Sequence, residues 1–205
     1  MQKLSGSSDI RAELYRLVQH LRTASESRCV VLGEEAKRVH SFGHTYDFGV
    51  ELALAPRETG VLSKVLSING YDYQDFKDSV LVRASGFPIR VMSRKEVYGI
   101  PIGDLQCNSV KMDVPLGSGG SGRYSADFAN PLHLAIMEYY RMKSNPFFES
   151  TATGFILNYI GKAQLGTDYM EKGRAFVKSN ELALKRYLKG EFEGFTGMVL
   201  GHFSP

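Results

Sequence analysis

The stretch CVVLGEEAKRVHSFGHTYDFGVELAL, residues 29–54, decides the fold class of this chain. It opens with an apolar run at 29–32, which is followed by a glycine and by a charged segment at 34–39. A second turn with a glycine leads into another apolar run at 48–54. Short apolar runs bounded by glycine are typical of buried strands, and the charged segment is long enough for about two helical turns. The stretch therefore predicts strand, turn, short helix, turn and strand, which is the layout of a mixed α/β domain.

Two carboxylates lie on the second of these predicted strands. Asp47 and Glu51 are four residues apart, so an extended strand presents both side chains on the same face. Two negative charges on one face are unfavourable unless a cation lies between them, and a divalent metal ion is the usual cation. The spacing therefore predicts a metal-binding pair.

The first two-thirds of the chain continues this mixed pattern, and the last third is helical. Amphipathic periodicity predicts helices at 9–24, 58–68, 130–142, 150–162, 167–179 and 180–189. Strands are predicted at 79–82, 89–92, 97–102 and 108–114, and the tail at 192–205 has no clear period. The predicted fold class is α/β (α+β), a mixed sheet followed by a helical C-terminal region.

The segment Gly-Ser-Gly-Gly-Ser-Gly at 117–122 formally satisfies the G-x-G-x-x-G pattern of dinucleotide-binding loops. That motif needs a helix directly behind its glycines, whereas the next helix start is indicated only at Asn130-Pro131. The composition is typical of a flexible linker. We therefore predict an α/β domain at 1–116, a Gly/Ser linker at 117–123 and a mostly helical region at 124–205.

The composition is that of an ordinary globular protein, with 43% hydrophobic and 23% charged residues among 205. The net charge of +3 is too small to indicate a nucleic-acid partner by itself. Cys29 and Cys107 lack CxxC spacing and are predicted to be buried free thiols, with a single disulfide as the alternative. No apolar run approaches the length of a membrane span and no signal-peptide pattern opens the chain, so we expect a cytoplasmic protein.

The stretch at 29–54 resembles the entry motif of the nucleotidyltransferase superfamily, in particular its CCA-adding and poly(A) polymerase branch. Those enzymes carry a strand, a glycine pair, a short helix with a basic residue, and a strand with two aspartates spaced D-x-D. Gly33, Lys37 and Arg38 stand near the corresponding places of the helix, and Asp47 stands at the first aspartate. The resemblance implies a nucleotidyltransferase-like palm followed by a helical region.

The chain departs from the family pattern at two positions. Glu34 replaces the second glycine, and D-x-D reads Asp47-Phe48-Gly49, so Glu51 would have to supply the second carboxylate. The family's third carboxylate lies on a later strand, where Asp113 is the candidate. The resemblance thus implies that Asp47, Glu51 and Asp113 are the catalytic residues and hold Mg²⁺ for nucleotidyl transfer.

Two further sets of residues are candidates for binding phosphates. The resemblance implies that the backbone at Gly33 and the side chains of Lys37 and Arg38 bind a nucleoside triphosphate. Basic residues on the helices near the C-terminus predict contacts with RNA or DNA phosphates, with a solvated helix face as the alternative: Arg174, Lys178, Lys185 and Arg186. Arg90, Arg94 and Lys95 form a second basic segment.

Three functions are consistent with these patterns. The first is metal-dependent transfer of a nucleotide from a nucleoside triphosphate to an RNA or protein hydroxyl. The second is a catalytically degenerate module that has the nucleotidyltransferase-like fold without its activity and binds nucleic acid or a partner protein. The broken D-x-D motif favours this second function. The third is a structural or assembly protein without any such site.

Overall fold

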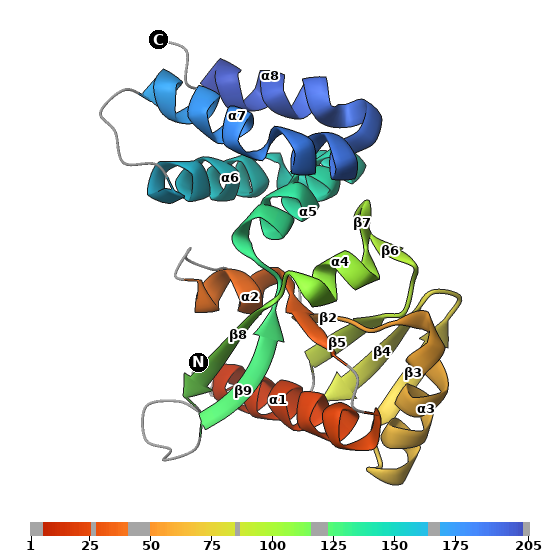
Figure 1. Cartoon of the computed structure of the whole chain (residues 1–205). Coiled ribbons are helices and arrows are strands. Elements are labelled where there is room, and N and C mark those ends of the chain that lie inside the picture. The colour runs from red at the N-terminus through yellow and green to blue at the C-terminus, as the bar shows by residue number, and fades with distance from the viewer. Residues whose placement is uncertain are drawn as a thin grey trace. The chain divides into compact units, whose positions relative to one another are not determined.

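The protein is described by a computed structural model that covers residues 6–25, 28–40, 50–84, 87–115, 123–163 and 169–202 (Figure 1). The chain divides into two compact units. The first comprises Met1–Val97 and Pro101–Asn130, and the second comprises Tyr98–Ile100 and Pro131–Pro205. The predicted class, a mixed α/β fold followed by a helical C-terminal region, is confirmed.

A seven-stranded mixed sheet forms the centre of the first unit. Its strands are β1 (Val30–Leu32), β2 (Val50–Ala53), β3 (Asp72–Phe76), β4 (Ser79–Ala84), β5 (Phe87–Met92), β8 (Val110–Pro115) and β9 (Arg123–Phe128). They lie in the order β3-β4-β5-β2-β1-β9-β8, and a second sheet holds the short strands β6 (Glu96–Val97) and β7 (Ile100–Pro101). Strand β1 is antiparallel to β2 and parallel to β9, and β2 is parallel to β5.

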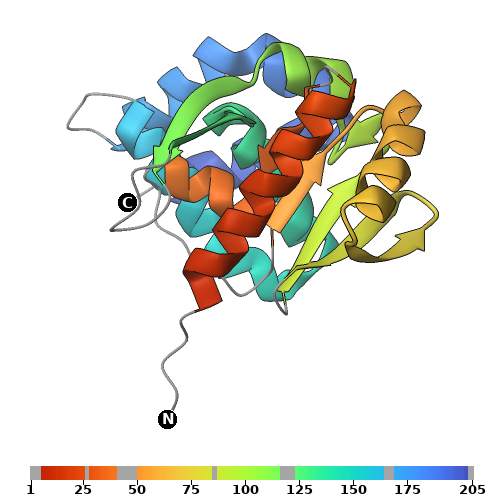
Figure 2. The same ribbon diagram turned by 90° about the horizontal axis from the view of Figure 1, so that it is seen from below.

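Helices α1 (Gly6–Ser25) and α3 (Thr59–Ile68) cover one face of this sheet (Figure 2). Apolar residues of α1 such as Leu14, Leu17 and Leu21 recur at helical spacing and are fully buried. Alternate residues of the strands, among them Val80 and Val82 in β4, are also buried. Each such aliphatic side chain contributes about 1.5–3 kcal/mol when it leaves water, which makes this layer the core of the unit.

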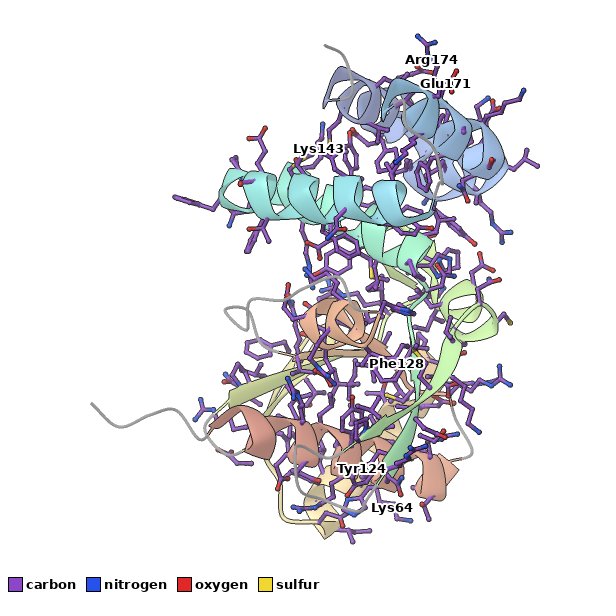
Figure 3. The ribbon with its side chains drawn as sticks, turned by 90° about the vertical axis from the view of Figure 1, so that its left-hand side faces the viewer. Lys64, Tyr124, Phe128, Lys143, Glu171 and Arg174 are labelled. Carbon is purple, nitrogen blue, oxygen red and sulfur yellow. The ribbon has the colours of Figure 1, made fainter. Side chains whose placement is uncertain are left out.

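Aromatic rings of β9 complete this core beneath α1. The ring of Tyr15 stacks on Tyr124 with centroids 5.6 Å apart, and it meets Phe128 edge-on at 6.5 Å. Figure 3 labels both β9 residues, and Phe128 is fully buried. Strand β9 is an inner strand of the sheet, between β1 and the edge strand β8, although it lies inside the region at 124–205 that we predicted to be mostly helical.

The second face of the sheet carries most of its charged residues. The strand register places Glu51 of β2 beside Leu32 on one side and beside Arg90 of β5 on the other. Asp127 of β9 lies on the same face, because it pairs with Val30, which is two residues from Leu32. This charged face contains every residue of the sheet that was predicted to bind a metal.

Two short helices also belong to the first unit, α2 (Gly33–Val39) and α4 (Ile102–Cys107).

The second unit contains four α-helices in its described residues: α5 (Pro131–Ser144), α6 (Glu149–Ala163), α7 (Tyr169–Leu188) and α8 (Phe192–His202). Short 3-10 turns span Pro146–Phe148 and Lys189–Glu191, and a third, in the first unit, spans Pro56–Glu58. Aromatic contacts hold the helices together: Tyr139 meets Phe195 at 5.3 Å and Tyr159 meets Phe176 at 5.5 Å.

Several boundaries differ from those predicted. The helical region begins at Pro131, because residues 123–128 form β9, which pairs antiparallel with β8. The Gly/Ser segment at 117–122 lies outside the described residues, between these two paired strands. The helices predicted at 167–179 and 180–189 are a single helix, α7, and the unpatterned tail contains α8.

The two cysteines are free, and only one of them is buried. Cys29 is fully buried, as predicted, whereas Cys107 is exposed at the end of α4, so the prediction for that residue was wrong. Burial raises the pKa of the Cys29 thiol to about 12. No helix in the described parts of the chain is both long and apolar enough to cross a lipid bilayer.

Candidate functional site

The chain passes from β1 into α2 through Gly33. This glycine has a φ of 64°, a backbone conformation that residues with a side chain rarely adopt, and it forms an isolated bridge to Val50 at the start of β2. The predicted order of strand, glycine, short helix and strand is present at 30–53, with residues 41–49 outside the described part, and the second strand is antiparallel to the first. Gly33 itself is buried.

The two cationic side chains of α2 that were predicted to bind phosphate both form ion pairs with neighbouring carboxylates. Lys37 forms an ion pair with Glu34, and the side chains are only 3% and 4% exposed. Arg38 donates two hydrogen bonds to Glu35, from Nε at 2.9 Å and from Nη2 at 2.6 Å. Both positive charges are thus balanced within the helix that carries them.

Glu35 is the centre of a buried polar cluster between α1 and α2. Besides Arg38, it accepts a hydrogen bond of 2.6 Å from the hydroxyl of Tyr15, and Arg11 lies 3.4 Å from its second oxygen. Burial, followed by the charge of Glu35 and the hydrogen bond to it, raises the pKa of Tyr15 far above its ordinary value. The hydrogen bond from Arg38 to Glu35 raises the pKa of that guanidinium. The cluster fixes α2 against α1.

The three predicted metal ligands do not meet within the described residues. Asp47 lies in the segment at 41–49, outside them. Glu51 is buried on β2, with 7% of its surface exposed. Asp113 is exposed on β8, the edge strand, and β1 and β9 lie between β8 and β2. Three strand spacings of about 4.8 Å separate Glu51 and Asp113 by roughly 14 Å across the sheet, and Asp113, which pairs with Ser125, is also displaced from Glu51 along the strands.

Within the described residues, the strands on either side of Glu51 place no second carboxylate at its level. Mg²⁺ is held by oxygen ligands in an octahedral shell, through carboxylates above all. The neighbouring strands instead present Leu32 and Arg90 at the level of Glu51. Within the described ranges there is also no group of three or more His, Cys, Asp or Glu residues that could hold a metal ion.

Two charged residues of this face were not assigned to the site from the sequence. In the sequence Arg90 belongs to a basic segment, and its position beside Glu51 follows from the parallel register of β2 and β5. Asp127, which is 7% exposed, lies opposite Lys111 on β8. No local motif marks either residue, because their neighbours come from strands distant in the sequence.

The basic residues predicted to contact nucleic acid all lie exposed on α7. Arg174, labelled in Figure 3, projects away from the helix. Lys185 forms an ion pair of 2.5 Å with Glu181, and its hydrogen bond lowers the pKa of that carboxyl. The guanidinium of Arg186 lies 5.6 Å from the ring centroid of Tyr187. The positive charge of α7 is therefore partly neutralised by its own acidic residues.

The sequence matches no known family, and no curated protein is detectably similar to it. Among solved structures, the chain is similar to the crystal structure of ANT(2″)-Ia in complex with adenylyl-2″-tobramycin. The sequence identity is 11% and the TM-score is 0.48, over 95% of this chain and 99% of that chain. A similarity of this size does not assign the chain to a family.

Proposed function

We propose that this chain is a catalytically degenerate, nucleotidyltransferase-like module that binds nucleic acid without transferring a nucleotide. The observation that carries the proposal is the position of Arg90 directly beside Glu51 on the adjacent parallel strand. The positive charge of an arginine at this position repels a divalent cation that approaches the carboxylate of Glu51. The place beside Glu51 thus disfavours a divalent cation and favours an anion.

The charges of α2 support the same proposal. In nucleotidyl transfer, basic side chains near the glycine turn bind the triphosphate, and here those side chains would be Lys37 and Arg38. Lys37 is buried against Glu34, and Arg38 is bonded to Glu35. Releasing Lys37 to a ligand would break its buried ion pair with Glu34, which is strongly unfavourable, and releasing Arg38 would remove two hydrogen bonds to the buried carboxylate of Glu35.

The second candidate is metal-dependent transfer of a nucleotide to an RNA or protein hydroxyl. Gly33, with its positive φ between β1 and α2, favours it, because the glycine turn is the part of the sequence that resembles the nucleotidyltransferases. In that function Asp47, Glu51 and Asp113 would hold Mg²⁺, and Gly33, Lys37 and Arg38 would bind the nucleoside triphosphate.

Incubation of the full chain with labelled nucleoside triphosphates, Mg²⁺ or Mn²⁺, and RNA or protein acceptors tests the two candidates. We expect no incorporation above the background of a denatured sample, and we expect salt-dependent binding of labelled RNA or DNA in the same preparation. Incorporation that disappears in Asp47→Asn would establish the enzyme instead. A stable oligomer that neither incorporates nucleotide nor binds nucleic acid would indicate a structural role.

A further inference from the structure

A groove of about 470 Å³ lies on the charged face of the sheet, at the turn between β3 and β4. It is lined by residues of β3, β4 and β5 and of the segment after β5, among them Phe76, Lys77, Asp78, Leu81, Arg90 and Arg94. We call it the cationic groove, because three of these six side chains are positively charged and one is negatively charged. An excess of positive charge in a concave surface attracts anions.

The cations of the groove are available to a ligand. Lys77 and Arg90 are exposed, and neither has an ion-pair partner among the residues that the structure describes. Arg94 donates a hydrogen bond of 3.4 Å to the backbone carbonyl of Asp78, which holds the side chain near the turn, and no described carboxylate forms an ion pair with it. This arrangement contrasts with α2, where each cation has a carboxylate partner.

An aromatic ring lies on the same face of the sheet as these cations. Phe76 pairs with Ser79, and Leu81, two residues further along β4, pairs with Arg90, so Phe76 and Arg90 project to one side. Half of the Phe76 surface is exposed, although phenylalanine is among the residues most often buried. A solvent-exposed ring beside arginines is the combination that binds nucleic-acid bases and phosphates together.

We infer that the cationic groove binds single-stranded nucleic acid, with phosphates on Lys77, Arg90 and Arg94 and a base stacked on Phe76. Every charged residue of the groove is exposed, so the groove is open to solvent and suits a strand that passes across it. In a duplex the bases stack on one another and offer no free face to Phe76. The inference deepens the proposed function, on which it rests, by naming the nucleic acid and its place on the sheet.

Fluorescence anisotropy of a labelled oligouridylate titrated with the full chain tests this site. Arg90→Glu and Arg94→Glu should each weaken binding by about tenfold at low salt and should each reduce the slope of log K against log salt by about 0.7. Lys64→Glu on α3 is the matched control, since Lys64 is exposed (Figure 3), lies outside the groove and changes the net charge equally. Its affinity should stay within about twofold of the unmodified chain, because phosphates bind to local charges.

Phe76→Ala separates stacking from charge. It should weaken the oligouridylate complex about tenfold and leave binding of inorganic polyphosphate, which has no bases, unchanged. A single nucleotide should bind much more weakly than the oligonucleotide. Thermal unfolding confirms that each variant is folded, and all of these positions are exposed.

Three outcomes would overturn the inference: equal losses in Arg90→Glu and Lys64→Glu, equal losses in Arg90→Glu and Arg174→Glu, or an unchanged affinity in Phe76→Ala. In each case binding without incorporation still supports the proposed function, and only the assignment of that binding to the cationic groove would be wrong. Nucleotide incorporation by the unmodified chain would instead overturn the proposed function. The variants of Arg90, Arg94 and Phe76 would still test whether nucleic acid binds in the cationic groove.

Discussion

Lys37 and Glu34 form an ion pair one helical turn apart in α2, and almost no part of either side chain reaches solvent. Replacing Lys37 by methionine leaves the carboxylate of Glu34 buried beside an apolar chain. We expect Lys37→Met to lower the free energy of unfolding by about 3–5 kcal/mol, as measured by urea denaturation. The double variant Glu34→Leu/Lys37→Met should recover most of that loss, because no buried charge then remains without a partner.

Arg16→Met is the matched control for this pair. Arg16 also pairs with a glutamate three residues away, Glu13, but its side chain is 54% exposed. A surface pair of this kind contributes less than about 1 kcal/mol, so the variant should unfold close to the unmodified chain. If Lys37→Met instead keeps its stability and loses affinity for nucleoside triphosphates, Lys37 is a phosphate ligand and the proposed function is wrong.

The two cysteines should differ sharply in reactivity. Cys107 is exposed, whereas Cys29 is fully buried and has a pKa of about 12, so it carries almost no thiolate near neutral pH. We expect a thiol reagent at about pH 8 to modify one cysteine in the folded protein and both in urea. Cys107→Ser should abolish the reaction of the folded protein, and a rapid reaction that persists in this variant would contradict the burial of Cys29.

Local patterns predicted the elements whose periodicity is regular. The helix predicted at 9–24 is α1 and the strand predicted at 89–92 lies in β5. The two helices predicted at 167–179 and 180–189 are one, because the side chain of Asn180 donates a hydrogen bond of 2.9 Å to the carbonyl of Phe176. The side chain of Asn180 thus donates to the preceding turn of the helix. The side chain of an N-cap residue would instead accept a hydrogen bond from a backbone N–H of the following turn.

Which residues lie together at the candidate site depends on the strand order and the strand register, and no local sequence pattern contains either. The spacing of Asp47 and Glu51 is a local property, but the distance from Glu51 to Asp113 follows from the strand order, which inserts β1 and β9 between their strands. The position of Arg90 beside Glu51 follows from one particular register of two parallel strands. A shift of that register by one residue would turn Arg90 to the other face of the sheet.

His40 should make the stability of the first unit depend on pH. Its Nε2 lies 3.0 Å from the carbonyl oxygen of Ala129. Burial lowers its pKa below the ordinary 6.5, and the hydrogen bond to Ala129 opposes this shift only in part. The unfolded chain therefore binds a proton at a higher pH than the folded chain does, so the free energy of unfolding falls as the pH drops below about 6.5.

His40→Gln isolates this contribution, since glutamine does not titrate and still offers an N–H donor. Urea denaturation at a series of pH values should show a smaller loss of stability between about pH 7 and pH 5 in the variant than in the unmodified chain. A steeper loss in the variant would mean that the folded state favours the charged imidazolium, and the sign of the shift would be wrong.

Gly99 belongs to the second unit together with Tyr98 and Ile100, and it should tolerate no side chain. Its φ is 74°, and a Cβ atom there would lie 2.8 Å from Cε2 of Tyr140 and 2.8 Å from the carbonyl oxygen of Tyr187. Tyr140 has little room to move, because its hydroxyl donates to that same carbonyl at 3.0 Å. We expect Gly99→Ala to destabilise the second unit by about 2–3 kcal/mol, the strain of the left-handed backbone plus the steric clash.

Gly154→Ala in α6 is the matched control, because it lies in the same unit and a Cβ atom there meets nothing within 4 Å. Alanine is the better helix former, so this variant should be more stable by about 0.5–1 kcal/mol. Differential scanning calorimetry of both variants measures the two shifts on the same unit. Equal melting temperatures for Gly99→Ala and the unmodified chain would contradict both the positive φ of Gly99 and its packing against Tyr140 and Tyr187.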